Sequence, residues 1–325
     1  MVSKELFELA VLASTRIEPK NVIGTKSEYR VHGALKYYFQ PDDRFHEVKT
    51  EGFICDAVSE DGSEIFEIQT RGLNRLRSKI ERLTVSHTLT VIHPIITEKR
   101  IYVTYAESGE ASVRKSPKRG FETDIFGEIY SIREHLTNPS LRIKLVQIKC
   151  DELRVYAGSK ESRKPFAKPI SIERIPTELI EIIDLGCRED YLRFIPQGLP
   201  REFGQAEFSR LGGIPRSGAG LIINPLISLG LIEKAGKRGR AYLYRLCDIA
   251  DTLKKDENSR ISHLFYYWVY YFLVLFLGSA SQMYASNLSA HLLHSSAVLT
   301  VHATTGTLKS LRQRVRETFG VSLWL

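Results

Sequence analysis

Two neighbouring segments carry side chains that could bind a metal ion. Asp56 lies in GFICDAV, Glu67 and Gln69 lie in EIFEIQ, and a polar turn over residues 60–63 separates the two segments. Because alternate side chains of a strand share a face, Glu67 and Gln69 are expected on one face, and hairpin pairing would set Asp56 beside them. Mg2+ prefers such oxygen ligands, together with water and substrate phosphate. The hairpin therefore predicts a magnesium site suited to phosphodiester hydrolysis, with Mn2+ as a substitute.

Each residue of this hairpin has an expected role. Asp56, Glu67 and the backbone carbonyl of Ile68 would bind the metal, and Gln69 would orient the attacking water. As an amide, Gln69 cannot act as a general base. Glu28, on a helix before the strands, would serve as an outer or second-metal ligand. The alternative is an exposed hairpin whose acidic side chains are only solvated, since a short motif is weak evidence alone.

The flanking elements decide between these readings. Apolar spacing predicts a helix over residues 28–39, and β-forming segments predict strands over 46–50, 52–58 and 64–69. A second helix is expected over 72–83 and a further strand over 89–96. The predicted order is α-β-β-β-α-β, in an α/β domain over residues 26–110. This order places an arginine-rich helix directly after the acidic hairpin, as a phosphodiesterase site requires.

Basic residues after the hairpin could contact nucleic acid. Arg71, Arg75 and Lys79 recur every four residues and could line a phosphate-binding groove, although a solvated basic face is the alternative. His32, one helical turn after Glu28, could contact phosphate or be a partly buried structural residue. Glu47 could approach the metal or form a salt bridge at the rim.

Two further regions are basic. A connecting α/β segment is expected over residues 111–175, and helix, turn, helix and hairpin patterns over 176–250 predict a winged helix-turn-helix. Pro225 interrupts its second helix, so non-specific backbone contact or dimerisation is as well supported as base reading. Contacts with DNA phosphates are expected from Lys115, Lys118, Arg119, Lys237, Arg238 and Arg240.

The element order and motifs resemble the PD-(D/E)xK nuclease superfamily, the restriction-endonuclease-like proteins. The resemblance implies Asp on the second core strand and E-x-K on the third, which correspond to Asp56 and to Glu67-Ile68-Gln69, with glutamine replacing lysine. More closely, EYRVHGALK, EVKTEGFICD, EIQTR, HPI, RKSPKRG and GKRGRAYLYR are similar to uncharacterised bacterial nuclease-like proteins with a C-terminal winged helix. The resemblance covers roughly residues 26–246 and implies a role in DNA repair or defence.

Composition narrows the partners and the compartment. The 325 residues carry a net charge of +8, which favours anionic partners such as DNA. The four scattered cysteines are typical of reduced thiols in a cytoplasmic protein, and residues 1–25 are expected to form a short helix or an unstructured extension rather than a secretory signal.

The tail over residues 251–325 has a different character. No Asp, Glu, Lys or Arg occurs from Ile261 to Leu308, and residues 264–277 are continuously apolar or aromatic. Extension to residue 285 reaches the length of a membrane helix. The alternatives are a buried or dimer-forming helix, or a terminal sequence foreign to the fold, such as a frame-shifted end.

Two functions therefore stand at this point. The first is a metal-dependent DNA endonuclease. The second is a non-catalytic DNA-binding protein or regulator on a degenerate nuclease scaffold, which the replacement of lysine by Gln69 keeps open.

Overall fold

A computed structural model describes residues 3–15, 26–156 and 169–247, with side chains from residue 30 in the second range. The chain divides into two compact units, Met1–Asp256 and Glu257–Leu325, and the second falls outside these ranges. The tail and its membrane alternative at residues 264–285 therefore lie outside the described residues. Within the described ranges, no helix is both long and apolar enough to cross a membrane.

The first part of the chain follows the predicted order of elements. Helix α1 (Lys4–Ser14) is followed by α2 (Lys26–Phe39), then by strands β1 (His46–Thr50), β2 (Phe53–Val58) and β3 (Glu64–Ile68). A 3-10 turn, η2 (Leu73–Leu76), leads into α3 (Arg77–Leu83), and β4 (Thr88–Tyr105) comes next. The short-helix alternative for the N-terminus is the one observed, because Phe7 of α1 packs edge-on against Tyr38 of α2.

Seven strands form the main, mixed sheet in the order β1-β2-β3-β4-β6-β7, with β5 (Ala111–Lys115) also paired to β4. Strands β1, β2 and β3 are antiparallel neighbours, whereas β3, β4 and β6 (Leu141–Tyr156) run parallel. The edge strand β7 (Ile170–Leu185) is antiparallel to β6. The protein is therefore of the α/β class.

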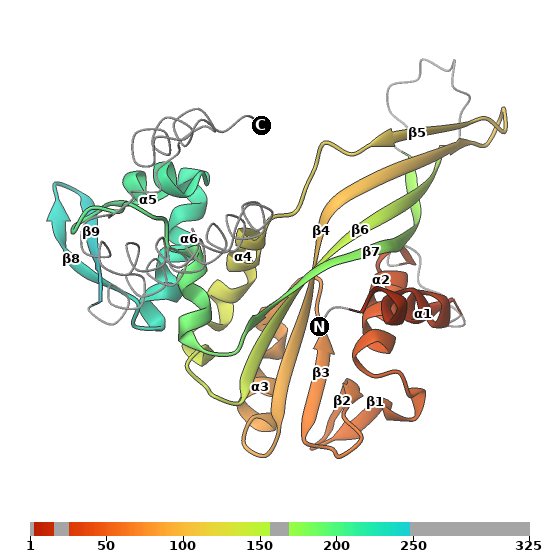
Figure 1. The fold of residues 1–325 in the computed structure, drawn as a ribbon, viewed down its shortest axis with the longest axis horizontal. Coiled ribbons are helices and arrows are strands. Elements are labelled where there is room, and N and C mark those ends of the chain that lie inside the picture. Colours follow the sequence, from red (N-terminus) through yellow and green to blue (C-terminus); the bar gives the residue numbers. More distant parts are fainter. Residues whose placement is uncertain (1–2, 16–25, 157–168, 248–325) are drawn as a thin grey trace, which may run out of the picture. The chain divides into compact units, whose positions relative to one another are not determined.

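Alternating side chains divide the sheet into two apolar faces. Phe66 and Ile68 of β3 pack with Val31 and Leu35 of α2, while Ile65 packs on the other face with Ile80 of α3. Helices thus cover both faces, α1 and α2 on one and α3 on the other (Figure 1). Residues that point from β3 to opposite sides consequently meet different helices.

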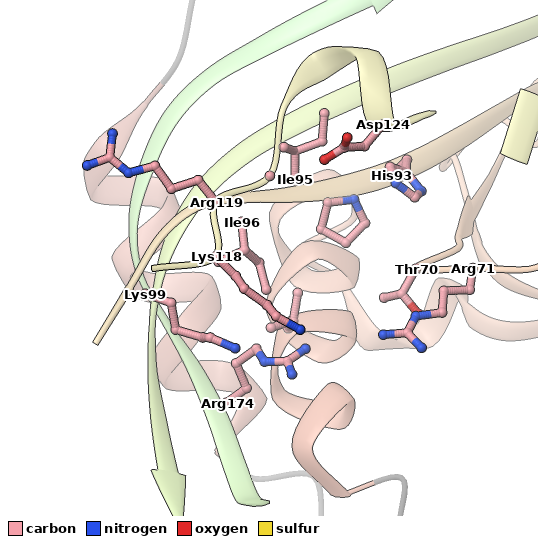
Figure 2. A pocket seen from close by; sticks show the side chains of 13 residues that line it. Thr70, Arg71, His93, Ile95, Ile96, Lys99, Lys118, Arg119, Asp124 and Arg174 are labelled. Atoms are coloured by element: carbon pink, nitrogen blue, oxygen red, sulfur yellow. The ribbon is translucent and has the colours of Figure 1, made fainter. Parts of the chain in front are cut away.

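The edge of β4 that faces β3 changes partner along its length. It pairs with β3 as far as Ile92 and with β5 from Arg100 onward, which leaves residues 93–99 between the two partners. Pro94, which has no backbone N–H to donate, lies in this interval. A pocket of about 280 Å³ opens there, lined by His93, Lys99 and residues from four other segments (Figure 2).

The boundary predicted at residue 176 is wrong, because Pro176 lies within β7, whose pairing with β6 continues to Leu185. The connecting segment predicted for residues 111–175 is likewise part of the main sheet. Strand β7 can continue through Pro176 because it is an edge strand and Pro176 sits at a register shift beside Lys149 and Cys150, where a missing N–H is tolerated.

The remaining elements pack onto the face of the sheet that carries α3. The segment between β5 and β6 contains η3 (Glu122–Ile125), α4 (Phe126–Ile129) and η4 (Tyr130–His135). After β7 come η5 (Arg188–Phe194), α5 (Gln205–Gly212), α6 (Arg216–Ser228) and a hairpin of β8 (Ile232–Arg238) and β9 (Ala241–Leu246). Helix α6 continues through Pro225, so the expected interruption does not occur.

One apolar core joins these C-terminal elements to the sheet. Phe126 and Phe194 make an edge-to-face contact with ring centroids 4.8 Å apart, and both belong to the same buried cluster as Ile143 and Ile222. A chain that ends at residue 186 would expose this surface to water.

We therefore expect a chain cut after residue 186 to bind a hydrophobic dye and to lose cooperative unfolding, which the full chain retains. Dye fluorescence and urea denaturation of the two chains measure this. A cut chain that unfolds cooperatively and binds no dye would show that the sheet is an independent domain.

Candidate active site

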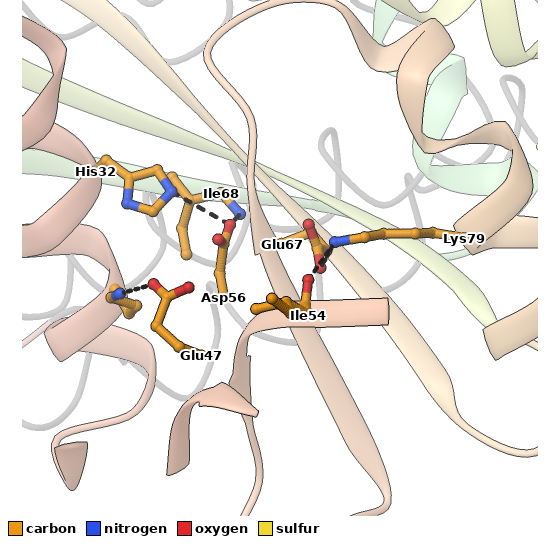
Figure 3. Close-up of polar contacts among 8 residues, drawn as sticks. His32, Glu47, Ile54, Asp56, Glu67, Ile68 and Lys79 are labelled. Carbon is orange, nitrogen blue, oxygen red and sulfur yellow. Dashed lines mark hydrogen bonds and ion pairs between the residues drawn. The ribbon is translucent and has the colours of Figure 1, made fainter. Parts of the chain in front are cut away.

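Asp56 lies where β2 and β3 diverge. Ala57 pairs with Phe66 and Val58 pairs with Ile65, and Asp56 is the next residue along β2. Its Oδ2 atom accepts a hydrogen bond from the Ile68 backbone N–H at 2.8 Å and lies 3.2 Å from Nε2 of His32 on α2. The carboxylate thus bridges the two separating strands and contacts α2 (Figure 3).

The surroundings of Asp56 favour its ionised form. Burial alone would raise the pKa of Asp56, but the hydrogen bond and charge of His32, the Ile68 N–H and the charge of Lys79 together hold that pKa below its usual value. Asp56 is therefore a carboxylate at neutral pH.

Glu67, on β3, is almost completely buried, with a relative exposure of 1%. Its Oε1 atom accepts a hydrogen bond from Nζ of Lys79 at 2.6 Å, and the same ammonium donates to the Ile54 carbonyl at 2.7 Å. Burial, and then the negative charge of Asp56, raise the pKa of Glu67 to about 7, although Lys79 opposes this change. Glu67 is thus close to half-protonated at neutral pH.

The two carboxyl groups differ in protonation because their surroundings differ. Asp56 has a histidine and a backbone N–H for partners, whereas Glu67 is enclosed between strands with Lys79 as its ion-pair partner (Figure 3). Neighbouring carboxyl groups whose pKa values are pushed apart are typical of sites that move protons or bind cations.

Lys79 does not lie where its spacing predicted. Arg71, Arg75 and Lys79 were expected on one groove-lining face, but residues 73–76 form a 3-10 turn with three residues per turn, and α3 begins only at Arg77. Arg71 therefore lines the pocket beside β4, Arg75 is exposed on η2, and Lys79 points to Glu67.

A signal for the position of Lys79 was present in the sequence. It lies three residues after Leu76 and four before Leu83, both of which are buried, so a helix places it at the edge of the core-facing stripe. This spacing favours a partly buried lysine over a solvated or phosphate-binding one.

The other residues predicted for the site are Gln69, Ile68 and Glu28. Strand β3 ends at Ile68, and the Gln69 backbone N–H donates to Ile92 while its carbonyl accepts from Nδ1 of His93 at 2.7 Å. Ile68 contacts Asp56 through its N–H, whereas its carbonyl was the predicted ligand. Glu28 lies in the first turn of α2, and its side chain is outside the described part of the chain.

Glu47 forms the rim ion pair that was the alternative to metal binding. Its Oε1 atom lies 2.5 Å from Nζ of the buried Lys36, and its side chain is 59% exposed. Glu47 also has a φ of 51°, a left-handed conformation that non-glycine residues rarely adopt. This backbone turn lies directly beside Asp56 in the register of β1 and β2.

The remaining basic candidates are spread over three places. Lys115 forms an ion pair with Glu98 at 2.5 Å, while Lys118 and Arg119 line the pocket beside β4. At the tip of the β8–β9 hairpin, Lys237 lies 4.8 Å from the Tyr242 ring centroid. Arg238 lies 3.9 Å from Glu207, and Arg240 is exposed.

Asp56 and Glu67 fit a hard divalent cation in ligand type. In the part of the chain that the structure describes, no group of three or more His, Cys, Asp and Glu side chains could hold a metal ion. Mg2+ nevertheless binds commonly through one or two carboxylates, with water and phosphate oxygens completing its shell. Burial and the charge of Asp56 both disfavour the ionised form of Glu67, and a bound cation would offset both effects.

Comparisons with known proteins give a family model and a distant relative. Residues 29–186 match the model of a domain of unknown function, DUF8091, a range that includes Asp56, Glu67, Lys79 and the pocket beside β4. An uncharacterised protein of Treponema pallidum (strain Nichols) is 29% identical over 227 residues, which cover 69% of this chain and 87% of that protein. No solved structure matches the chain. The chain is thus similar over its sheet to a domain whose function has not been described.

Proposed function

We propose that the protein is a Mg2+-dependent endonuclease acting on DNA, with residues 26–110 as a core of the PD-(D/E)xK type. The observation that carries this proposal is that Asp56 lies close enough to Glu67 for its charge to contribute to the raised pKa of Glu67, whose carboxylate also accepts a hydrogen bond from Lys79. This is the acid, acid and lysine combination of that superfamily, with the lysine supplied by α3 rather than by position 69.

Each residue has a defined task in this proposal. Asp56 and Glu67 would hold the cation, which when bound supplies a Lewis acid for the phosphoryl group and an activated water. Lys79 keeps Glu67 partly ionised and carries positive charge at the site. His32 fixes Asp56 and could donate a hydrogen bond to a nearby phosphate oxygen.

The C-terminal elements would hold the substrate. The order α5, α6, β8, β9 is that of a winged helix, and the hairpin tip carries Lys237, Arg238 and Arg240. These residues would contact DNA phosphates, which positions a substrate without reading its bases.

Plasmid cleavage tests the proposal. Supercoiled plasmid is incubated with the protein in Mg2+, Mn2+ or EDTA, and nicked and linear products are separated on a gel. We expect nicking with Mg2+ or Mn2+ and none with EDTA. A protein that retards DNA but nicks nothing with either metal would instead be a DNA-binding regulator on a nuclease-like scaffold.

The raised pKa of Glu67 predicts how nicking depends on pH. A metal competes with the proton for this carboxylate, so the rate at limiting Mg2+ should rise between about pH 6 and pH 8. In Lys79→Ala, loss of the ammonium raises the Glu67 pKa further and should move the midpoint of the rise to higher pH. Rate measurements from pH 5.5 to 9 test this, and equal midpoints in the two proteins would separate Lys79 from the titrating group.

A further inference from the structure

The pocket beside β4 concentrates positive charge from separate parts of the chain. Arg71 follows β3, Lys99 lies on β4, Lys118 and Arg119 follow β5, and Arg174 lies on β7. Together with the single carboxylate of Asp124, these five basic side chains line a space of about 280 Å³. Such an excess of cations around a concave space favours an anionic ligand.

The charges of Lys99 and Arg174 are only partly balanced by protein groups. Both lie within ion-pair distance of the buried Glu152, which Arg154 also contacts, so three cations share one carboxylate. Nε of Arg174 lies 3.7 Å from Glu152 and is buried without a hydrogen-bond partner in the described structure. Figure 2 shows the ends of Lys99, Lys118 and Arg174 pointing into the pocket, whereas the guanidinium of Arg119 points away.

Gly120 holds the segment that carries Lys118 against β4. Its backbone N–H donates to the Ile96 carbonyl at 2.8 Å, and a Cβ atom at this position would lie 3.0 Å from both Ile95 and Ile96. This close approach requires glycine, because a larger residue would push the segment away from the strand. The backbone that carries Lys118 is thereby held close to β4, beside the pocket.

The remaining lining favours one charge state of the ligand. Val31, Pro94, Ile95 and Ile96 form an apolar wall, and burial lowers the pKa of His93, whose Nδ1 atom is engaged by the Gln69 carbonyl. Histidine therefore adds no charge at neutral pH, and the pocket depends on ammonium and guanidinium groups. These groups suit a phosphate with two negative charges.

The pocket adjoins the candidate active site along two elements. Thr70 and Arg71 follow Glu67 by three and four residues, so their backbones lie at most about 14 Å from that of Glu67. Val31 of the lining precedes His32, the contact of Asp56. A nucleic-acid strand at the candidate site could thus reach the pocket with a phosphate within about four nucleotides, at 3.4 Å per nucleotide of one strand.

We propose that this pocket binds the terminal phosphate of a nucleic-acid strand, a phosphomonoester. A terminal group can enter a pocket of this size, whereas an internal phosphodiester is held by chain on both sides and carries one negative charge. The proposal rests on the proposed function for the identity of the strand. It predicts that the protein prefers ends that carry phosphate to ends that carry a hydroxyl group.

Binding to labelled oligonucleotides in EDTA tests the proposal without requiring cleavage. Single-stranded and nicked duplex oligonucleotides carry a 5′-phosphate, a 3′-phosphate or hydroxyl ends, and fluorescence anisotropy gives the dissociation constants. We expect one phosphorylated end to bind about tenfold more tightly than its hydroxyl counterpart in the full-length protein, from the charge-assisted hydrogen bonds that it adds. Inorganic phosphate and a nucleoside monophosphate are used as competitors and should lower this preference.

Lys118→Ala and Arg119→Ala form a matched pair, since they remove the same charge from adjacent residues. Lys118→Ala should abolish the preference for a phosphorylated end, and Arg119→Ala should retain it even though its overall DNA affinity falls. Equal binding of all ends by the unmodified protein, or equal loss of the preference in both variants, would overturn the proposal. A preference for phosphorylated ends without plasmid nicking would contradict the proposed nuclease activity but support the phosphate-binding pocket. Plasmid nicking without such a preference would support the nuclease activity and overturn the proposal for the pocket.

Discussion

Replacing Asp56 by asparagine should lower the rate of plasmid nicking by about a thousandfold, the upper range for removal of one electrostatic group from a catalytic site. Asparagine keeps an oxygen that can accept the Ile68 N–H, so the divergence of β2 and β3 is preserved. It removes the negative charge that would bind the cation. The measurement is the initial nicking rate in Mg2+, compared with the unfolding free energy of the same preparation.

Glu47→Gln is the matched control for this prediction. Glu47 lies on the strand next to Asp56, but its side chain is 59% exposed and pairs with Lys36. The same loss of one charge should therefore leave the nicking rate within about threefold of the unmodified protein, because glutamine keeps an oxygen that can accept the hydrogen bond of the buried Lys36. Equal losses in the two variants would assign the effect of Asp56→Asn to net charge and not to a metal ligand.

Replacing Glu67 by glutamine should abolish nicking and also stabilise the protein at pH 8. The pKa of Glu67 is raised from 4.5 to about 7 in the folded chain. Its contribution to stability is thus fully favourable below the unfolded pKa and is lost as pH rises through the folded pKa. Glutamine does not ionise, so the variant avoids this loss. Its free energy of unfolding at pH 8 should exceed that of the unmodified protein by about 1 to 3 kcal/mol.

Urea denaturation at pH 5 and pH 8 measures this effect. Near pH 5 the two proteins should differ much less, because Glu67 is protonated in the folded state there. Lys79 retains its hydrogen bond to the Ile54 carbonyl in the variant, and its side chain is 19% exposed, so its charge is not left without contacts. A Glu67→Gln protein that is destabilised more at pH 8 than at pH 5 would show that Glu67 is a structural ion-pair partner of Lys79 and not a strained acid.

The local part of the fold was predictable because its signals are local. The strand segments around Cys55 and Ile65 are rich in β-forming residues, and the turn at Gly62 has the positive φ that glycine permits. The boundary expected at residue 176 was wrong because the continuation of β7 through Pro176 depends on β7 being an edge strand, and that is a property of the whole sheet. A break in one strand and a domain boundary look alike in sequence.

The site was predictable only in its carboxyl groups. Their placement beside one another follows from the hairpin, whereas the pairing of Lys79 with Glu67 requires α3 to pack on one particular face. The ammonium group that pairs with Glu67 comes from a residue twelve positions later, on another element. The pocket could not be predicted from the sequence. Its basic residues come together only when β3 and β5 pair with the same edge of β4.

A crystal of the protein grown with Mn2+ tests the central claim most directly, because anomalous scattering locates this ion without assumptions. We expect a peak within coordination distance of the carboxylates of Asp56 and Glu67, with water in the remaining positions, and no such peak in Asp56→Asn crystals. A structure in which Mn2+ binds elsewhere, while Glu67 remains paired with Lys79 and Asp56 with His32, would contradict the account.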